Sequence, residues 1–153
     1  MCGIFGWILG GRRRESPELL ARLTDMMVHR GPDGSGFWLG STPDERFQVG
    51  LGHRRLSIID IAGGVQPMAS ADGRLLLTYN GEIYNYVELR DELRALGHTF
   101  DTESDTEVLI EAFRAWDTGA LSKFRGMFAF AIFDKATGRM VFGRDQFGKK
   151  PLY

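Results

Sequence analysis

The sequence predicts a layered α/β sandwich, and three observations support this prediction. Three amphipathic helical patterns alternate with short strand patterns, and one strand pattern, Met127 to Phe133, is apolar without interruption. A strand that is apolar on both faces has to be covered on both, which requires stacked layers. With 153 residues, 43% of them hydrophobic and 25% charged, the chain is long enough for one domain to bury a core of this kind.

The first elements are a strand and a helix. Residues Cys2 to Leu9 alternate as a strand does, with small or aliphatic residues on one face and aromatic or aliphatic residues on the other. A helix is expected from Pro17 to about His29, because Ser16 suits the N-cap and Pro17 suits the first helical position. Gly31-Pro32 is expected to end it.

Short strands are expected next, before a hairpin. The expected strands are Gly36 to Leu39, Phe47 to Leu51 and Leu56 to Ile59. Asp72-Gly73 is a hairpin signal that leads into a strand from Leu75 to Tyr79.

The second half of the sequence predicts two helices and a pair of strands. One helix runs from Tyr86 to Leu96, with Asn85 as its cap, Glu88 three residues later, and Gly97 at its end. Another begins at Asp105, where Ser104 and Glu107 form a capping box. The buried strand follows, and after a turn at Lys135 to Gly138 a returning strand is expected from Met140 to Gly143.

Charge and composition exclude several classes of protein. Nineteen basic and twenty acidic residues leave a net charge of -1, which argues against binding to nucleic acid or a membrane surface through bulk charge. No apolar run reaches the length of a membrane span, and the first residues do not form a signal peptide, so we expect a cytoplasmic protein. One cysteine allows no internal disulfide, and three scattered histidines give no metal-site spacing.

Cys2 is the most informative residue for chemistry. Removal of Met1, expected before a small second residue, would place the Cys2 thiol beside its own α-amine. An α-amine has a pKa of about 7.7 to 8.0. One residue could therefore supply both the nucleophile and the base. The alternative is a buried, inert cysteine.

Tyr79-Asn80-Gly81-Glu82 ends a hydrophobic strand and offers hydrogen-bond donors. The Asn80 side-chain amide and the backbone N–H of Gly81 are the kind of pair that an oxyanion hole requires. The alternative is a simple Asn-Gly turn.

Seven segments together resemble the glutaminase domain of class II glutamine amidotransferases, which are N-terminal-nucleophile hydrolases. Within that group the chain is most similar to the glutamine-hydrolysing asparagine synthetases. The segments occur in the family's order across the whole chain: C-G-I-F-G at Cys2, H-R-G-P-D at His29, H-R-R-L-S-I-I-D at His53, Y-N-G-E-I-Y-N at Tyr79, S-D-T-E at Ser104, G-M-F-A-F-A-I-F-D at Gly126 and G-R-D-Q-F-G-K-K-P-L-Y at Gly143.

The resemblance implies an α+β fold, a four-layer αββα sandwich, and a role for each matching residue. Cys2 would attack the side-chain amide of L-glutamine, release ammonia and form a glutamyl thioester. Asn80 and Gly81 would bind the oxyanion. Arg55 would bind the α-carboxylate, and Asp105 with help from Glu82 would bind the α-ammonium group. The backbone of Leu56, Ser57, Ile58 and Ile59 would line the same pocket.

Several of these residues could have a different, purely structural role. Asp105 lies in the first turn of a helix, where a carboxylate is favourable to the helix dipole. Either Arg55 or its neighbour Arg54 could be an ordinary surface charge. His29 and His53 are less suitable as bases, since the N-terminal amine fills that role. His29 to Asp33 is instead expected to shape a loop near the site.

The resemblance covers only the front of the family's protein. No ATP-pyrophosphatase phosphate loop is present, and the chain stops at Tyr153 inside the last matching segment. We therefore expect residues 1–153 to be a glutaminase domain, truncated at its C-terminal end, without the synthetase domain or subunit that would receive ammonia. Glutamine hydrolysis would need no cofactor or metal, and ATP and Mg would serve only the absent domain. The alternatives are the amidotransferase domain of another synthetase and a glutamine-binding fragment without turnover.

Overall fold

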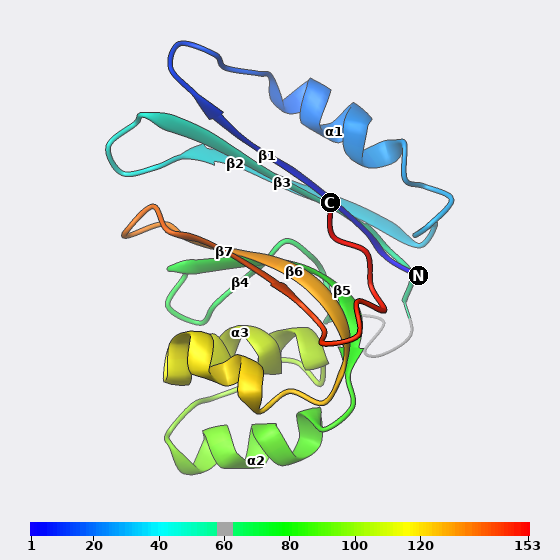
Figure 1. The fold of residues 1–153 in the computed structure, drawn as a ribbon, viewed down its shortest axis with the longest axis vertical. Helices are drawn as coiled ribbons and strands as arrows, with labels where there is room; N and C mark the ends of the chain where they lie inside the picture. The colour runs from blue at the N-terminus through cyan, green and yellow to red at the C-terminus, as the bar shows by residue number, and fades with distance from the viewer. Residues whose placement is uncertain (58–62) are drawn as a thin grey trace.

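The computed structural model describes residues 1–57 and 63–153, which form four layers (Figure 1). One helix covers a three-stranded sheet, a four-stranded sheet stacks beneath it, and two further helices cover the lower face. The upper layers consist of β1 (Gly3–Gly10), α1 (Pro17–Asp25), β2 (Gly34–Ser41) and β3 (Phe47–Arg55). The lower layers consist of β4 (Met68–Ala69), β5 (Leu75–Ile83), α2 (Tyr86–Ala95), α3 (Asp105–Trp116), the 3₁₀ turn η1 (Asp117–Ser122), β6 (Gly126–Asp134) and β7 (Met140–Arg144).

All strand pairs in both sheets are antiparallel, in the orders β1-β3-β2 and β4-β5-β6-β7. The αββα architecture that the resemblance implied is confirmed. No helix among the described residues is long and apolar enough to cross a bilayer.

Helix α1 packs closely on the upper sheet. The Ser16 hydroxyl accepts a hydrogen bond from the Leu19 N–H (3.3 Å), which confirms the expected N-cap. A Cβ at Gly52 of β3 would lie 2.1 Å from the Thr24 hydroxyl oxygen, so glycine permits the close approach of helix and sheet. The helix ends at Asp25, four residues before the expected His29. Bonds between residues three apart form tighter turns there, and Met26 is exposed.

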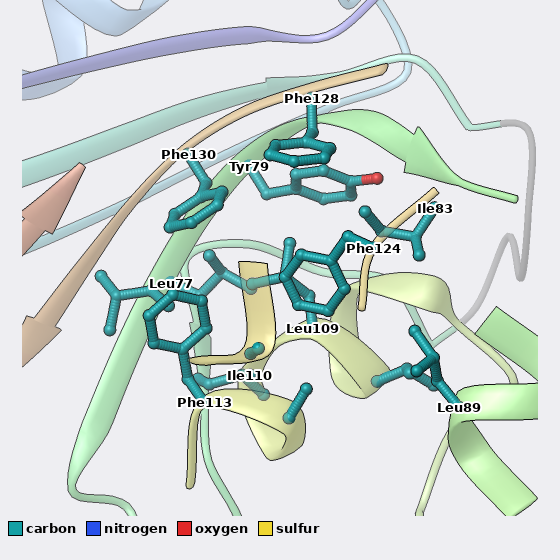
Figure 2. Close-up of a cluster of buried hydrophobic side chains, with 14 of the residues drawn as sticks. Leu77, Tyr79, Ile83, Leu89, Leu109, Ile110, Phe113, Phe124, Phe128 and Phe130 are labelled. Carbon is teal, nitrogen blue, oxygen red and sulfur yellow. The ribbon is translucent and has the colours of Figure 1, made fainter. Parts of the chain in front are cut away.

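The main core lies between the lower sheet and its helices (Figure 2). One face of β6 places Phe128, Phe130 and Ile132 in this core, and its other face turns Ala131 and Phe133 toward the upper sheet. The expected two-sided burial of this strand is therefore confirmed. The same alternation in β5 directs Tyr79 toward the helices and Asn80 toward the upper sheet.

Two hydrogen bonds join β3 to β5 across the sheets. The Thr78 hydroxyl donates to the Gly52 carbonyl oxygen (3.2 Å), and the His53 Nε2 lies 3.1 Å from the Tyr79 carbonyl oxygen. These contacts fix the end of β3 against the middle of β5, and four of the expected site residues, Arg55, Asn80, Gly81 and Glu82, lie on these two strands.

Three further local predictions differ from the structure where it describes the residues concerned. Leu56 and Ser57 are not in a strand, and Ile58 and Ile59 lie outside the described residues. Asn85 makes no capping bond, because its side chain bonds instead to the Lys123 carbonyl and the Arg125 N–H. Ser104 does cap α3, but the partner expected for its capping box, Glu107, accepts from the N–H groups of residues 101 and 102 instead.

The hairpin and the end of α2 follow the sequence. The turn between β4 and β5 holds Gly73 at φ +68°, and Gly97 after α2 has φ +93°, both of which favour glycine. Strand β5 is longer than expected, because it continues through Asn80 and Gly81 to Ile83.

Candidate active site

Most of the expected site residues line one cavity of about 70 Å³, between the ends of the two sheets and the start of α3. Cys2 enters from the start of β1, Arg55 and Leu56 from the end of β3, and Asp105 from the first turn of α3. Residues Asn80, Gly81 and Glu82 of β5 complete the expected set. Four separate parts of the chain are therefore needed to build it.

The Cys2 thiol is half-buried and free. Its Sγ accepts a hydrogen bond from the Leu56 N–H at 3.4 Å and lies 3.7 Å from the Leu56 carbonyl oxygen. Gly3, the next residue, pairs with Arg54 of β3 in the sheet register. The backbone after β3 therefore fixes the sulfur at the cavity wall, which an inert core cysteine would not need.

Arg54 and Arg55 have different surroundings. The Arg54 side chain is buried, donates to the Gly31 carbonyl (2.9 Å) and pairs with Asp25 (3.0 Å). The Arg55 guanidinium lies in the cavity against Gly64, where an added Cβ would be 2.5 Å from its terminal nitrogen. Neither arginine is an ordinary surface charge, and Arg55 is the one that faces the cavity.

The loop before β2 supports the segment that follows Arg55. The Asp33 N–H donates to the Arg55 carbonyl oxygen (3.0 Å), and Asp33 Oδ2 accepts from the Ser57 N–H (2.8 Å). Ser57 is not among the described residues that line the cavity. The His29–Asp33 segment therefore supports the backbone next to the cavity, near the site as the sequence suggested.

Asn80 and Gly81 lie within β5, so the Asn-Gly turn reading is wrong. Each pairs with a residue of β6, Asn80 with Ala129 and Gly81 with Phe128. Asn80 is buried and shares its strand face with Thr78, which bonds to the upper sheet. A Cβ at Gly81 would lie 2.3 Å from the Met127 carbonyl oxygen, so the neighbouring strand itself requires glycine here.

The Asp105 carboxylate is buried, with 5% of the residue exposed. Its Oδ2 accepts hydrogen bonds from the Tyr79 hydroxyl (2.8 Å) and the Ile83 N–H (3.0 Å), both on β5. Burial raises the pKa of Asp105 above its ordinary value, these two bonds oppose the rise, and the Glu82 charge adds to it. A carboxylate that only favoured a surface helix dipole would not be buried against β5 in this way.

The sequence did not identify every residue of the cavity. Gln66, Ser104, Thr106 and Tyr79 also line it. Gln66 Oε1 accepts from the Tyr79 N–H (2.6 Å), and its Nε2 lies 3.5 Å from the Thr106 hydroxyl. A single glutamine before a proline has no periodicity or spacing that would single it out, and Tyr79 was noticed only as part of a strand.

The two histidines considered as bases are placed differently. His29 is exposed. His53 is 1% exposed, and burial lowers its pKa from 6.5 to about 4, with a further small decrease from the Arg55 charge. It is neutral at pH 7 and bonds to the Tyr79 carbonyl, so it connects the sheets.

The buried His53 predicts acid sensitivity of the fold. Its unfolded pKa exceeds the folded value, so the unfolded chain binds more protons between pH 6.5 and 4, and stability is lost as the pH falls through that window. We expect this group to remove about 3 kcal/mol from the unfolding free energy by pH 4. Urea unfolding at several pH values should show a flatter acid profile for His53→Gln than for wild type. The exposed His29→Gln serves as the control, and an equally steep profile in His53→Gln would contradict the assignment.

Comparisons with known proteins agree with this geometry. The family described as the glutamine amidotransferase domain matches residues 1–153. The chain is 47% identical to asparagine synthetase [glutamine-hydrolyzing] 1 of Bacillus subtilis, covering all of this chain and 24% of that protein. It is 42% identical to a putative asparagine synthetase [glutamine-hydrolyzing] of Mycobacterium bovis, covering all of this chain and 25% of that protein. The chain thus spans about a quarter of the length of these curated relatives.

A solved structure shows the same architecture. A glutamine phosphoribosylpyrophosphate amidotransferase of B. subtilis, complexed with ADP and GMP, matches 95% of this chain and 37% of its own, with a TM-score of 0.68 and 25% identity. The family match spans the entire chain, and the four layers and the Cys2 cavity fit it. This chain belongs to the class II glutamine amidotransferases and has their N-terminal-nucleophile hydrolase fold.

Proposed function

We propose that Cys2 hydrolyses the side-chain amide of glutamine through a glutamyl thioester. The observation that supports this most directly is the shared cavity, which brings the Cys2 thiol together with the Asn80 amide and the Gly81 backbone. The test is steady-state release of ammonia and glutamate from glutamine, measured on the protein in its full natural length. Absence of both products would refute the proposal and favour a domain that only binds glutamine.

The proposed reaction balances with groups of the chain and water. The Cys2 α-amine takes the thiol proton while the sulfur forms a bond to the amide carbon, and the carbonyl oxygen becomes an oxyanion. Asn80 and Gly81 donate hydrogen bonds to that oxygen. The C–N bond then breaks, the ammonium of Cys2 returns the proton, and ammonia leaves. Water hydrolyses the thioester to glutamate and regenerates the thiol.

This mechanism requires a free Cys2 amine, so we predict that Met1 is absent from the active protein. With Met1 present, the Cys2 nitrogen would be an amide and could not accept a proton. The intact mass of an active preparation should be smaller by one methionine. A retained Met1 in fully active protein would contradict the amine-base mechanism.

Recognition of the amino-acid end of glutamine is proposed for other residues that line the same cavity. Arg55 would bind the α-carboxylate, since a guanidinium can bind a carboxylate through two hydrogen bonds. Asp105, with the Glu82 charge nearby, would bind the α-ammonium group, and the Leu56 backbone would contribute to the wall. These groups do not change charge when the amide is cleaved, so they should act on binding.

We therefore predict that Arg55→Ala and Asp105→Asn raise KM for glutamine by about 10- to 100-fold with little change in kcat. Glutaramate, which is glutamine without its α-amino group, distinguishes the two roles. As an inhibitor of glutamate formation it should bind Asp105→Asn as well as wild type, but Arg55→Ala more weakly. If either variant changed kcat and left KM unchanged, the binding role proposed for that residue would be wrong.

For the whole protein, we propose that the ammonia supports ATP-dependent asparagine synthesis. The support is the 47% and 42% identity to asparagine synthetases, compared with 25% identity to the phosphoribosylpyrophosphate amidotransferase. The acceptor would be aspartate on a synthetase domain or subunit, where ATP and Mg would be used. Glutamine labelled with ¹⁵N in its amide should yield asparagine labelled in its amide. We propose a cytoplasmic location as well, because a free thiol is kept reduced in that compartment.

A further inference from the structure

Tyr79 extends from the main core to the wall of the cavity. Its ring packs among the buried side chains of the lower layers, near Phe128 and Ile83, while its hydroxyl lies at the edge of that cluster (Figure 2). The residue is 2% exposed and also lines the cavity. A phenylalanine would fill the same core, so the hydroxyl group needs a separate explanation.

The Tyr79 hydroxyl group forms a hydrogen bond with Asp105. It donates to Asp105 Oδ2 at 2.8 Å, and the Ile83 N–H donates to the same oxygen at 3.0 Å. Two donors from one strand therefore hold one carboxylate oxygen, which limits the rotation of the group. Because Asp105 lines the cavity, these bonds constrain how its carboxylate can meet a ligand there.

The backbone of Tyr79 is held on both sides. Its N–H donates to Gln66 Oε1 (2.6 Å), and its carbonyl oxygen lies 3.1 Å from His53 Nε2. Both partners are buried, and the β5 ladder pairs Tyr79 with Phe130. The hydroxyl group is thus presented to Asp105 from a fixed position, which a flexible surface tyrosine could not provide.

The surroundings of Asp105 make its hydrogen bond from the Tyr79 hydroxyl important for keeping the carboxylate ionised. Burial raises the pKa of Asp105 and the Glu82 charge raises it further, so the ionised form needs hydrogen bonds to persist. Burial and the Asp105 charge also raise the pKa of Tyr79 well above 10, which keeps its hydroxyl proton available for donation. Tyr79 is therefore a permanent donor to the carboxylate.

We propose that Tyr79 is a positioning residue for substrate recognition, whose hydroxyl holds the Asp105 carboxylate ionised and oriented toward the α-ammonium group of glutamine. The proposal rests on the proposed function of this site. Tyr79 acts through Asp105 and does not itself touch the reacting amide. A purely structural tyrosine would affect the fold but not the selective recognition of the ammonium group.

The test is Tyr79→Phe in the protein at its full natural length. The change removes one oxygen and keeps the ring, so we expect an unchanged Tm within a few degrees. KM for glutamine should rise about 10-fold, because a hydrogen bond to a charged group is lost, while kcat stays within about twofold. The acid limb of kcat/KM should move to higher pH, since Asp105 loses a group that favours its ionised form. Tyr84→Phe, at a side chain that is 58% exposed, is the matched control and should match wild type.

Two further measurements separate positioning from packing. Glutaramate should inhibit Tyr79→Phe and wild type with the same constant, because it has no α-ammonium group. Adding Tyr79→Phe to Asp105→Asn should raise KM no further, since the residue acts through Asp105.

The outcomes also separate this proposal from the proposed function. An inactive wild type would refute the glutaminase function and the role of Tyr79 with it. An active wild type with an unchanged KM and pH profile in Tyr79→Phe would refute only the role of Tyr79. Weaker binding of glutaramate, or a lowered Tm with lowered kcat, would show that the hydroxyl supports the fold instead.

Discussion

Replacing Cys2 with alanine is expected to abolish ammonia release from glutamine and to leave the fold and glutamine binding nearly unchanged. The sulfur is the proposed nucleophile, and residues 1–153 contain no other cysteine that could replace it. Loss of a covalent nucleophile lowers kcat by about 10⁴-fold or more. Arg55 and Asp105 remain in the cavity, so glutamine should still bind. Ammonia release and calorimetric titration with glutamine would measure the two effects.

The design of the Cys2 variants needs one precaution. Alanine and serine are both small, so Met1 should be removed from Cys2→Ala and Cys2→Ser as it is from wild type. Cys2→Ser then retains the free amine and a weaker nucleophile, and is the matched control for the thiol. The electrophilic analogue diazo-oxo-norleucine should label wild type at Cys2 and neither variant. Ammonia release by Cys2→Ala at more than a trace would reject Cys2 as the nucleophile.

The sequence predicted the layers well because hydrophobic periodicity reports which faces are covered. The continuous apolar run of β6 required cover on both sides, and the structure places helices on one side and the upper sheet on the other. Boundaries were less predictable, because long-range contacts set them. Strand β5 continues past Tyr79 since β6 pairs with it as far as Ile83. Asn85 has the composition of a cap, but it bonds to the segment that leads into β6.

The sequence likewise predicted some residues of the candidate site and missed others. Cys2 and Asn80 were singled out by their own chemistry, whereas Arg55 and Asp105 were assigned because the seven segments resemble a family in order. Their supporting residues were not found. Gln66 bonds to the Tyr79 backbone 13 residues away, and the Tyr79 hydroxyl bonds to Asp105 26 residues away, contacts that no local pattern encodes. His53 was weighed as a base, and its burial together with its bond to the Tyr79 carbonyl shows instead that it connects two strands.

Asn80→Ala is expected to lower kcat by about 10²–10³-fold while KM changes little. The Asn80 side chain is proposed to donate to an oxyanion that exists only in the transition state, so its loss should not weaken binding of the ground state. Arg55 and Asp105 still hold the amino-acid end of glutamine in this variant. Steady-state ammonia release across a range of glutamine concentrations would separate kcat from KM.

Loss of packing at Asn80 is the competing explanation, and Thr78 provides a matched control for it. Thr78 lies two residues earlier on the same face of β5, and its hydroxyl bonds across the sheets to the Gly52 carbonyl. Thr78→Val removes a buried polar group from this face without removing an oxyanion donor, and should lower the unfolding free energy by about 1 kcal/mol. If Thr78→Val lowered kcat as much as Asn80→Ala does, a loosened contact between the sheets would explain both losses. A raised KM with an unchanged kcat in Asn80→Ala would instead assign the Asn80 amide to glutamine binding.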